Sequence, residues 1–226
     1  SDRHFTIEDR GLSDNHVYFW TTLPGETGPR AFAGVIAVSN ASDFIGRTTI
    51  AGNVVEASFM SSDALAFGGG VFVDGDASLL LEQSAVERNR VDARVPAGSP
   101  GTALAGGGGL SINGSLVIRN SRVVLNHISV FAPAGSVGAS GGGIANFGQT
   151  TLTRTLVAGN SIKGNAAGGF LDGGGITNKD IFGPAAILTL TDTTIVANTL
   201  QGTPGISLKG GGIFTDSPIT ASRTAI

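Results

Sequence analysis

Three consecutive glycines followed by an aliphatic residue recur five times in this chain of 226 residues. Successive runs lie 32 to 39 residues apart, as counted between their third glycines. Self-similarity at such a period indicates a stack of repeated supersecondary units and excludes most globular folds. The third glycines of the five runs are Gly70, Gly109, Gly143, Gly175 and Gly212.

An asparagine recurs in phase with the glycines, at spacings of 34 to 38 residues. An aliphatic residue stands three positions before each asparagine, and another stands two positions after it. Six copies in one register are typical of a corner that is repeated on every coil of a solenoid. The six asparagines are Asn15, Asn53, Asn89, Asn126, Asn160 and Asn198.

Short alternations of apolar and polar residues, such as Leu188-Thr189-Leu190, have the period of two that strands show. No window carries a helical stripe. We expect three short strands per repeat: one after the glycines, one before the asparagine and one across it. The predicted fold is therefore all-β, a right-handed parallel β-helix of about six coils with 34–38 residues each. The right hand follows the general preference of parallel crossovers.

Both recurring residue types have a structural explanation. Glycine accepts positive φ and lets neighbouring chains approach closely, so it suits a tight corner. Asparagine suits a corner as well, because its amide can bond to local backbone or to the asparagine of the next coil. We therefore assign the five third glycines and the six asparagines to the scaffold rather than to a catalytic site.

The pairing of Gly-Gly-Gly-Ile with an aliphatic-x-x-Asn motif resembles the repeats of bacterial surface β-helix proteins. It is similar to the polymorphic outer-membrane proteins, whose repeats pair Gly-Gly-Ala-Ile with Phe-x-x-Asn, and more broadly to the pectate-lyase-like superfamily. The resemblance spans roughly positions 5 to 226, with Gly in place of Ala and with Leu, Ile or Val in place of Phe. It implies a bacterial surface solenoid, and it is more specific for fold than for function.

Composition narrows the classes of partner. Only 14% of the residues are charged, which is low for a soluble domain and typical of extracellular repeat proteins. The net charge of −3 argues against binding to nucleic acid, and the lack of cysteine removes disulfides and thiolate metal sites. No apolar run approaches the length that spans a membrane. We expect an extracellular or cell-surface location on a bacterium.

The phase of the repeat suggests that residues 1–226 form a single β-helix domain cut in mid-coil at both ends. Ser1 falls inside a coil, and the asparagine that would follow Asn198 falls beyond Ile226. Two interpretations follow: the chain is a segment of a longer array, or its open ends stack on other copies and build a filament. The expected partners are thus flanking repeats or the chain itself, end to end, with a cell-surface glycan as a further candidate.

Two segments depart from the repeat and are candidate binding sites. Tyr18 and Trp20 are expected to point outward, where they would stack on sugar rings or cover an adjoining domain or an open edge. The coil after Gly175 carries an insertion within residues 178–186, which includes Lys179, Asp180 and Phe182. These residues would contact a partner or fold back on their own coil.

Variable segments before the glycine runs form a predicted ridge at residues 95–101, 132–135 and 202–205. Loops on a rigid scaffold often bind ligands, although tolerated length variation explains them too. The acidic residues are scattered over several coils, and no set of them converges as a calcium site requires. We therefore predict no catalytic residue, no metal ligand and no cofactor.

The leading hypothesis is a non-enzymatic extracellular module, such as a surface stalk, an adhesin or a filament-forming solenoid. The alternative, inherited from the resemblance, is a calcium-dependent polysaccharide lyase or glycoside hydrolase of the pectate-lyase-like superfamily. Ca²⁺ would be a cofactor only under that alternative.

Overall fold

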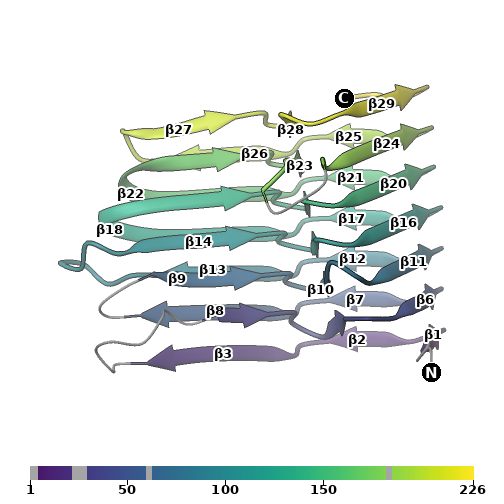
Figure 1. The fold of residues 1–226 in the computed structure, drawn as a ribbon, viewed down its shortest axis with the longest axis horizontal. Helices are drawn as coiled ribbons and strands as arrows, with labels where there is room; N and C mark the ends of the chain where they lie inside the picture. Colours follow the sequence, from purple (N-terminus) through teal and green to yellow (C-terminus); the bar gives the residue numbers. More distant parts are fainter. Residues whose placement is uncertain (1–4, 22–29, 60–62, 182–184) are drawn as a thin grey trace.

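A computed structural model describes residues 5–21, 30–59, 63–181 and 185–226. Every regular element in this part of the chain is a β-strand, and all strand pairs are parallel. The chain therefore forms a parallel β-solenoid, as predicted, whose coils stack from β1 to β29 in Figure 1. The described residues contain no helix long and apolar enough to cross a bilayer.

Three of the four sheets each take one short strand from a coil. Sheet A comprises β1 (Thr6–Glu8), β6 (Ser42–Gly46), β11 (Ser78–Glu82), β16 (Ser115–Arg119), β20 (Gln149–Thr153), β24 (Ile187–Thr191) and β29 (Ile219–Ser222). Sheet B comprises β2 (Gly11–Ser13), β7 (Thr49–Ala51), β12 (Ala85–Glu87), β17 (Arg122–Val124), β21 (Leu156–Ala158) and β25 (Thr194–Val196). Sheet D comprises β5 (Ile36–Val38), β10 (Val71–Val73), β15 (Leu110–Ile112), β19 (Ile144–Asn146), β23 (Ile176–Asn178) and β28 (Ile213–Thr215).

Sheet C is folded, because each coil crosses it twice. The outgoing leg contains β3 (His16–Thr21), β8 (Val54–Phe59), β13 (Arg90–Arg94) and β26 (Thr199–Gly202). The return leg contains β4 (Arg30–Phe32), β9 (Ala64–Phe67), β14 (Thr102–Gly106) and β27 (Ile206–Lys209). Two long strands run through both legs: β18 (His127–Ser140) and β22 (Ser161–Asp172).

A complete coil thus holds five strand segments rather than the three expected. The strand predicted across the asparagine is divided there into a strand of sheet B and the outgoing leg, and the return leg is an additional strand. The seven strands of sheet A and the six of sheets B and D agree with the prediction of about six coils. The segments predicted as a ridge lie at the tip of this excursion. Residues 95–101 and 203–205 connect the two legs, whereas residues 132–135 lie inside β18, at a register shift.

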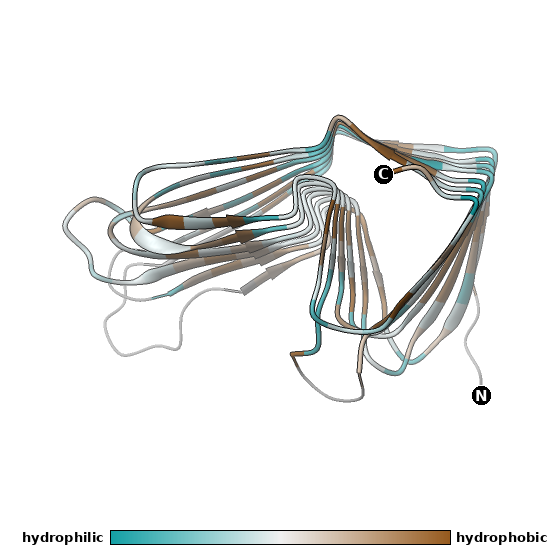
Figure 2. Cartoon of the chain, turned by 90° about the horizontal axis from the view of Figure 1, so that it is seen from above, coloured by the Kyte–Doolittle hydropathy of each residue, from teal (hydrophilic) through white to brown (hydrophobic). Residues whose placement is uncertain are grey.

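The coil has two lobes, which Figure 2 shows from above. Sheets A, B and D enclose a triangular lobe filled with Ile, Leu and Val, among them Ile45, Leu81 and Ile118. The two legs of sheet C enclose a flat lobe, whose core consists mostly of Ala and Val, such as Ala66, Val91 and Ala105. Small side chains fit there because the two legs face each other closely.

A narrow neck joins the lobes, and the glycine runs form one of its walls. The first glycine of a run has positive φ, as in Gly107 (φ 64°). A Cβ on the second glycine would overlap backbone, since at Gly108 it would collide with the carbonyl oxygen of Gly142. A Cβ on Gly109 would lie 3.0 Å from the side chain of Asn126. The glycines and the asparagines therefore face each other across one neck and are not separate corners.

The opposite wall of the neck is a continuous asparagine ladder. Asn126 Nδ2 donates to Asn160 Oδ1 of the next coil at 3.0 Å and to the carbonyl oxygen of Val86 on the preceding coil at 3.0 Å. The backbone N–H of Asn126 donates to the same Asn160 Oδ1. Five such links join the six asparagines predicted from the sequence. The ladder satisfies the amide groups of the four inner asparagines, which the neck buries completely.

The structure contains a sixth, altered copy of the glycine corner, which lacks the three consecutive glycines. Ala33, with φ 58°, takes the place of the first glycine, and Gly34 takes the place of the second. Ile36 pairs with Val71, the aliphatic residue that follows the next glycine run. The middle glycine is the one that this copy retains, in agreement with its close contact to the carbonyl of Gly69.

Candidate functional site

The return leg and sheet D meet at an inward corner of the coil, which we call the inner corner (Figure 2). Successive residues of a strand point to opposite faces, so alternate residues of both elements project into this corner. The positions from the return leg are the residues before each glycine run, namely Phe32, Phe67, Gly106, Ser140, Asp172 and Lys209. Those from sheet D are Ala37, Phe72, Ser111, Ala145, Thr177 and Phe214.

Aromatic rings line the first coils of the inner corner. Phe32 is 40% exposed, and its ring stacks on that of Phe67 with the centroids 5.8 Å apart. The ring of Phe72, from sheet D, lies 4.9 Å from that of Phe32. Together with Leu65 they form an apolar wall along a cavity of about 560 Å³. Large partly exposed rings in a concave site are typical of ligand-binding pockets.

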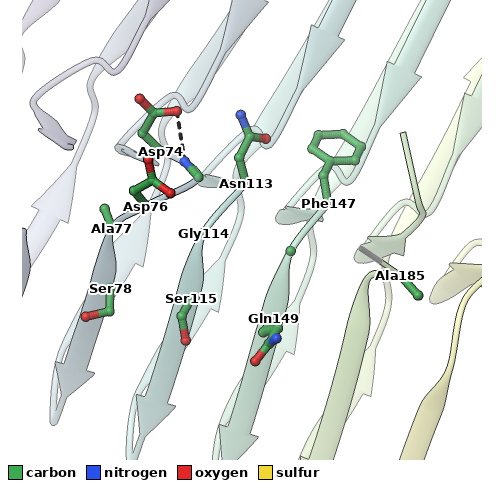
Figure 3. A pocket seen from close by; sticks show the side chains of 12 residues that line it. Asp74, Asp76, Ala77, Ser78, Asn113, Gly114, Ser115, Phe147, Gln149 and Ala185 are labelled. Carbon is green, nitrogen blue, oxygen red and sulfur yellow. Dashed lines mark hydrogen bonds between the residues drawn. The ribbon is translucent and has the colours of Figure 1, made fainter. Parts of the chain in front are cut away.

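A polar wall adjoins the aromatic one, along the turns from sheet D to sheet A. It lines a second cavity of about 670 Å³, drawn in Figure 3, and both cavities share Asp74, Asn113 and Phe147. We call the two cavities together the groove. The polar side chains come from successive coils: Asp74, Asp76, Ser78, Asn113, Ser115 and Gln149. Among the described residues that line the groove, none is basic.

Local turn chemistry fixes the polar wall. Asp74 follows β10, and its Oδ1 accepts a hydrogen bond of 2.9 Å from the backbone N–H of Gly75. Its Oδ2 accepts from the hydroxyl of Ser39 on the preceding coil at 3.3 Å. Asp and Asn are favoured at such turns because their side chains bond to nearby backbone. The same turn presents Asn113 on the next coil and Phe147 on the one after it, so this position is polar on two adjacent coils.

A second cluster, which we call the cage, occupies later coils of the inner corner. The ammonium of Lys179 lies 5.0 Å from the ring centroid of Phe170 and 5.9 Å from that of Phe214. It also lies 3.7 Å from Oδ2 of Asp172. Lys209 places its own ammonium 5.5 Å from Phe214. Two rings and a carboxylate around one ammonium make a cation-binding arrangement.

Asp172 is only 1% exposed, although it carries a carboxylate. Its Oδ1 has no hydrogen-bond partner within the described part of the protein. Burial raises the pKa of Asp172 above the ordinary value, and the nearby Lys179 and Lys209 only partly oppose this effect. The cage therefore contains a buried acceptor that its own lysines do not satisfy.

The structure separates the predicted binding residues. Lys179 belongs to the cage, and Asp180 is exposed beside it. Tyr18 is 55% exposed on the outgoing leg of the first coil, away from the inner corner. Trp20 lies on the same strand, but its side chain is outside the described residues, and so is all of Phe182. Tyr18 and Lys179 thus do not share a site.

The sequence did not reveal the aromatic and acidic residues of the inner corner. Three of them stand at one repeat position, immediately before the glycine corner, which holds Phe32, Phe67, Gly106, Ser140, Asp172 and Lys209 in coil order. This position varies in residue type although it adjoins a corner that recurs on every coil. Large aromatic or charged residues at such a position are the signal that would identify the site. Residues that recur in identical form do not include this position.

The outgoing leg carries a separate polar cluster. His127 Nδ1 lies 2.9 Å from the hydroxyl of Ser161, and Arg90 pairs with Asp92 at 2.8 Å. Burial lowers the pKa of His127; Arg90 and Lys163 add to this effect, whereas Asp92 opposes it. In the part of the chain that the structure describes, no group of three or more His, Cys, Asp or Glu is arranged to hold a metal ion.

Comparison of the chain with family models, with curated proteins and with solved structures finds no match.

Proposed function

We propose that this protein is a non-enzymatic extracellular adhesive module that holds a linear glycan in the inner corner. The observation that carries the proposal is the junction of the aromatic wall with the polar wall at Asp74, Asn113 and Phe147. A sugar ring has an apolar face of C–H groups and a rim of hydroxyls. It therefore suits a site that offers rings on one side and hydrogen-bonding oxygens and amides on the other.

The direction of the stack favours a linear polymer over a single sugar. The groove crosses several coils, and adjacent parallel strands lie about 4.8 Å apart. Equivalent backbone positions therefore repeat along the corner at that interval, so that successive coils can contact successive units of a chain. The ladder in the neck stabilises this spacing, because it links each coil to the next through side chain and backbone. A rigid stack of this kind suits a surface module or stalk of a bacterium.

Binding to a panel of immobilised linear glycans tests the proposal. Removal of a ring with Phe72→Ala is expected to weaken binding by about tenfold, which corresponds to about 1.4 kcal/mol. Tyr18→Ala is the matched control, because it removes an exposed aromatic side chain from a different face. We expect it to change the affinity less than twofold.

Two outcomes would overturn the proposal. One is an equal loss of affinity in both variants, which would move the binding site away from the inner corner. The other is release of shortened or unsaturated products from a bound polysaccharide, with turnover that EDTA abolishes. That result would favour the calcium-dependent lyase suggested by the resemblance.

A further inference from the structure

We propose that the glycan held in the inner corner carries free amino groups, as a deacetylated amino-sugar polymer does. The inference rests on the proposed function and adds the chemical class of the ligand. Two independent observations lead to it. The groove is acidic without a basic residue among its described lining residues, and the cage already holds an ammonium.

The groove provides negative charge where a cationic polymer would lie. Asp74 and Asp76 are both exposed on its polar wall. Asp74 accepts hydrogen bonds only from neutral donors, the Gly75 N–H and the Ser39 hydroxyl, among the bonds observed in the structure. Its charge is therefore not neutralised by a partner. A protonated amine on a ligand would form a charge-assisted hydrogen bond there.

The cage shows that the inner corner can bind an alkylammonium group. The Lys179 ammonium lies near the faces of two rings and at 3.7 Å from Asp172 Oδ2, which is long for a hydrogen bond. Asp172 Oδ1 remains without a donor although the carboxylate is almost completely buried. A ligand ammonium offers three N–H donors and would satisfy this oxygen. Lys179 then acts as an internal competitor that occupies the cage when no ligand is bound.

Asp74 of the groove and Lys179 of the cage lie on one line along the stack. Asp74 and Lys179 both follow a strand of sheet D, and their strands, β10 and β23, are three steps apart in the sheet. At the spacing of parallel strands this separation is about 14 Å along the axis. A linear polymer with an amine on each sugar would present cations to both clusters. A single amine would reach only one of them.

Calorimetric titration of the whole chain with two glucosamine oligomers of equal length tests the proposal, one fully deacetylated and the other fully N-acetylated. We expect the free-amine oligomer to bind about tenfold or more tightly than its acetylated counterpart. Asp172→Asn and Asp74→Asn should each weaken its binding by about fivefold to tenfold. Lys179→Met should strengthen it several-fold, since it removes the competitor. Glu82→Gln, on the outer face of sheet A, is the control for loss of one negative charge.

The outcomes separate the two proposals. Equal affinity for both oligomers would overturn the preference for amines and leave the glycan-binding module intact. Preferential binding that Asp172→Asn and Asp74→Asn reduce no more than Glu82→Gln does would reveal general charge attraction and overturn the assignment to the inner corner. A failure of the protein to bind any glycan in the panel would overturn both proposals. Weaker binding by Lys179→Met would show that Lys179 contacts the ligand, which contradicts its role as a competitor.

Discussion

The side chain of Asn126 bonds to coils on both sides, because its Nδ2 donates to Asn160 Oδ1 at 3.0 Å while its Oδ1 accepts from Asn89 Nδ2 at 3.0 Å. The backbone N–H of Asn89 donates to the same oxygen. Each inner asparagine therefore joins three coils and is fully buried. The ladder is a property of the stack, and no isolated coil can form it.

Asn126→Ala is expected to lower the free energy of unfolding by about 3 kcal/mol, because it leaves buried donors and acceptors on two neighbouring coils without partners. Urea denaturation measures the change. Asn15→Ala is the matched control, since Asn15 is exposed and its backbone N–H still donates to Asn53 after the substitution. The control should lose about 1 kcal/mol or less. Equal losses would contradict the role of burial in the ladder.

Gly108→Ala should destabilise the protein by about 3 kcal/mol or more, because its Cβ would overlap the carbonyl oxygen of Gly142 and the collision is with backbone. Gly75→Ala provides the comparison, as nothing lies within 4 Å of a Cβ at that position. We expect a change within about 0.5 kcal/mol there. Thermal unfolding of both variants decides the matter. A mild effect of Gly108→Ala would show that the neck can widen.

Asp172→Asn should raise the melting temperature at pH 7. The raised pKa of Asp172 means that the folded state disfavours the carboxylate, and the neutral amide removes this penalty. The advantage of the variant should shrink as the pH falls from the raised value towards the ordinary value of 3.8, because the acid then becomes protonated in both states. Calorimetric scans across this range test the sign. A lower melting temperature at pH 7 would mean that the contact with Lys179 outweighs burial.

Arg90→Gln should raise the pKa of His127, because it removes the cation that, after burial, contributes most to the lowered value. Asp92, which favours the protonated ring, would remain. In the wild type, the folded state disfavours protonation of His127, so this group reduces stability as the pH falls through the ordinary value of 6.5. An NMR titration of the imidazole resonances measures the pKa. An unchanged or lower value in Arg90→Gln would contradict the electrostatic explanation.

The sequence predicts the solenoid because the glycine runs and the asparagines recur in one phase, and a parallel stack places such residues over one another. It does not predict the flat lobe. The strands of that lobe are rich in Ala, and on several coils they are separated by segments of varying length such as residues 95–101, so they have no common period with the rest of the coil. The glycine wall and the asparagine wall face each other only in the folded coil, so no local sequence pattern predicts this contact.

The candidate site was even less accessible from sequence. The sequence indicates Lys179 only as part of an insertion, because its partner Phe170 lies on the other side of the glycine corner and its partner Phe214 lies on the next coil. Asp172 is a single acidic residue beside a glycine run, and nothing in the local sequence indicates that its side chain is buried. Sites of this kind depend on which irregular residues the stack brings together, and recurrence alone does not identify them.

The neck sets the spacing between successive coils, and this spacing does not depend on the length of the flat lobe in each coil. The glycine and asparagine walls hold neighbouring coils together. The segment that connects the outgoing leg to the return leg can therefore differ in length between coils without shifting the register of sheets A, B and D. On one coil residues 95–101 connect the two legs, whereas on the next coil β18 continues from the outgoing leg into the return leg without a break. The tip of the flat lobe is thus a display edge, where a new peptide can be inserted into one coil while the coils on either side keep their alignment.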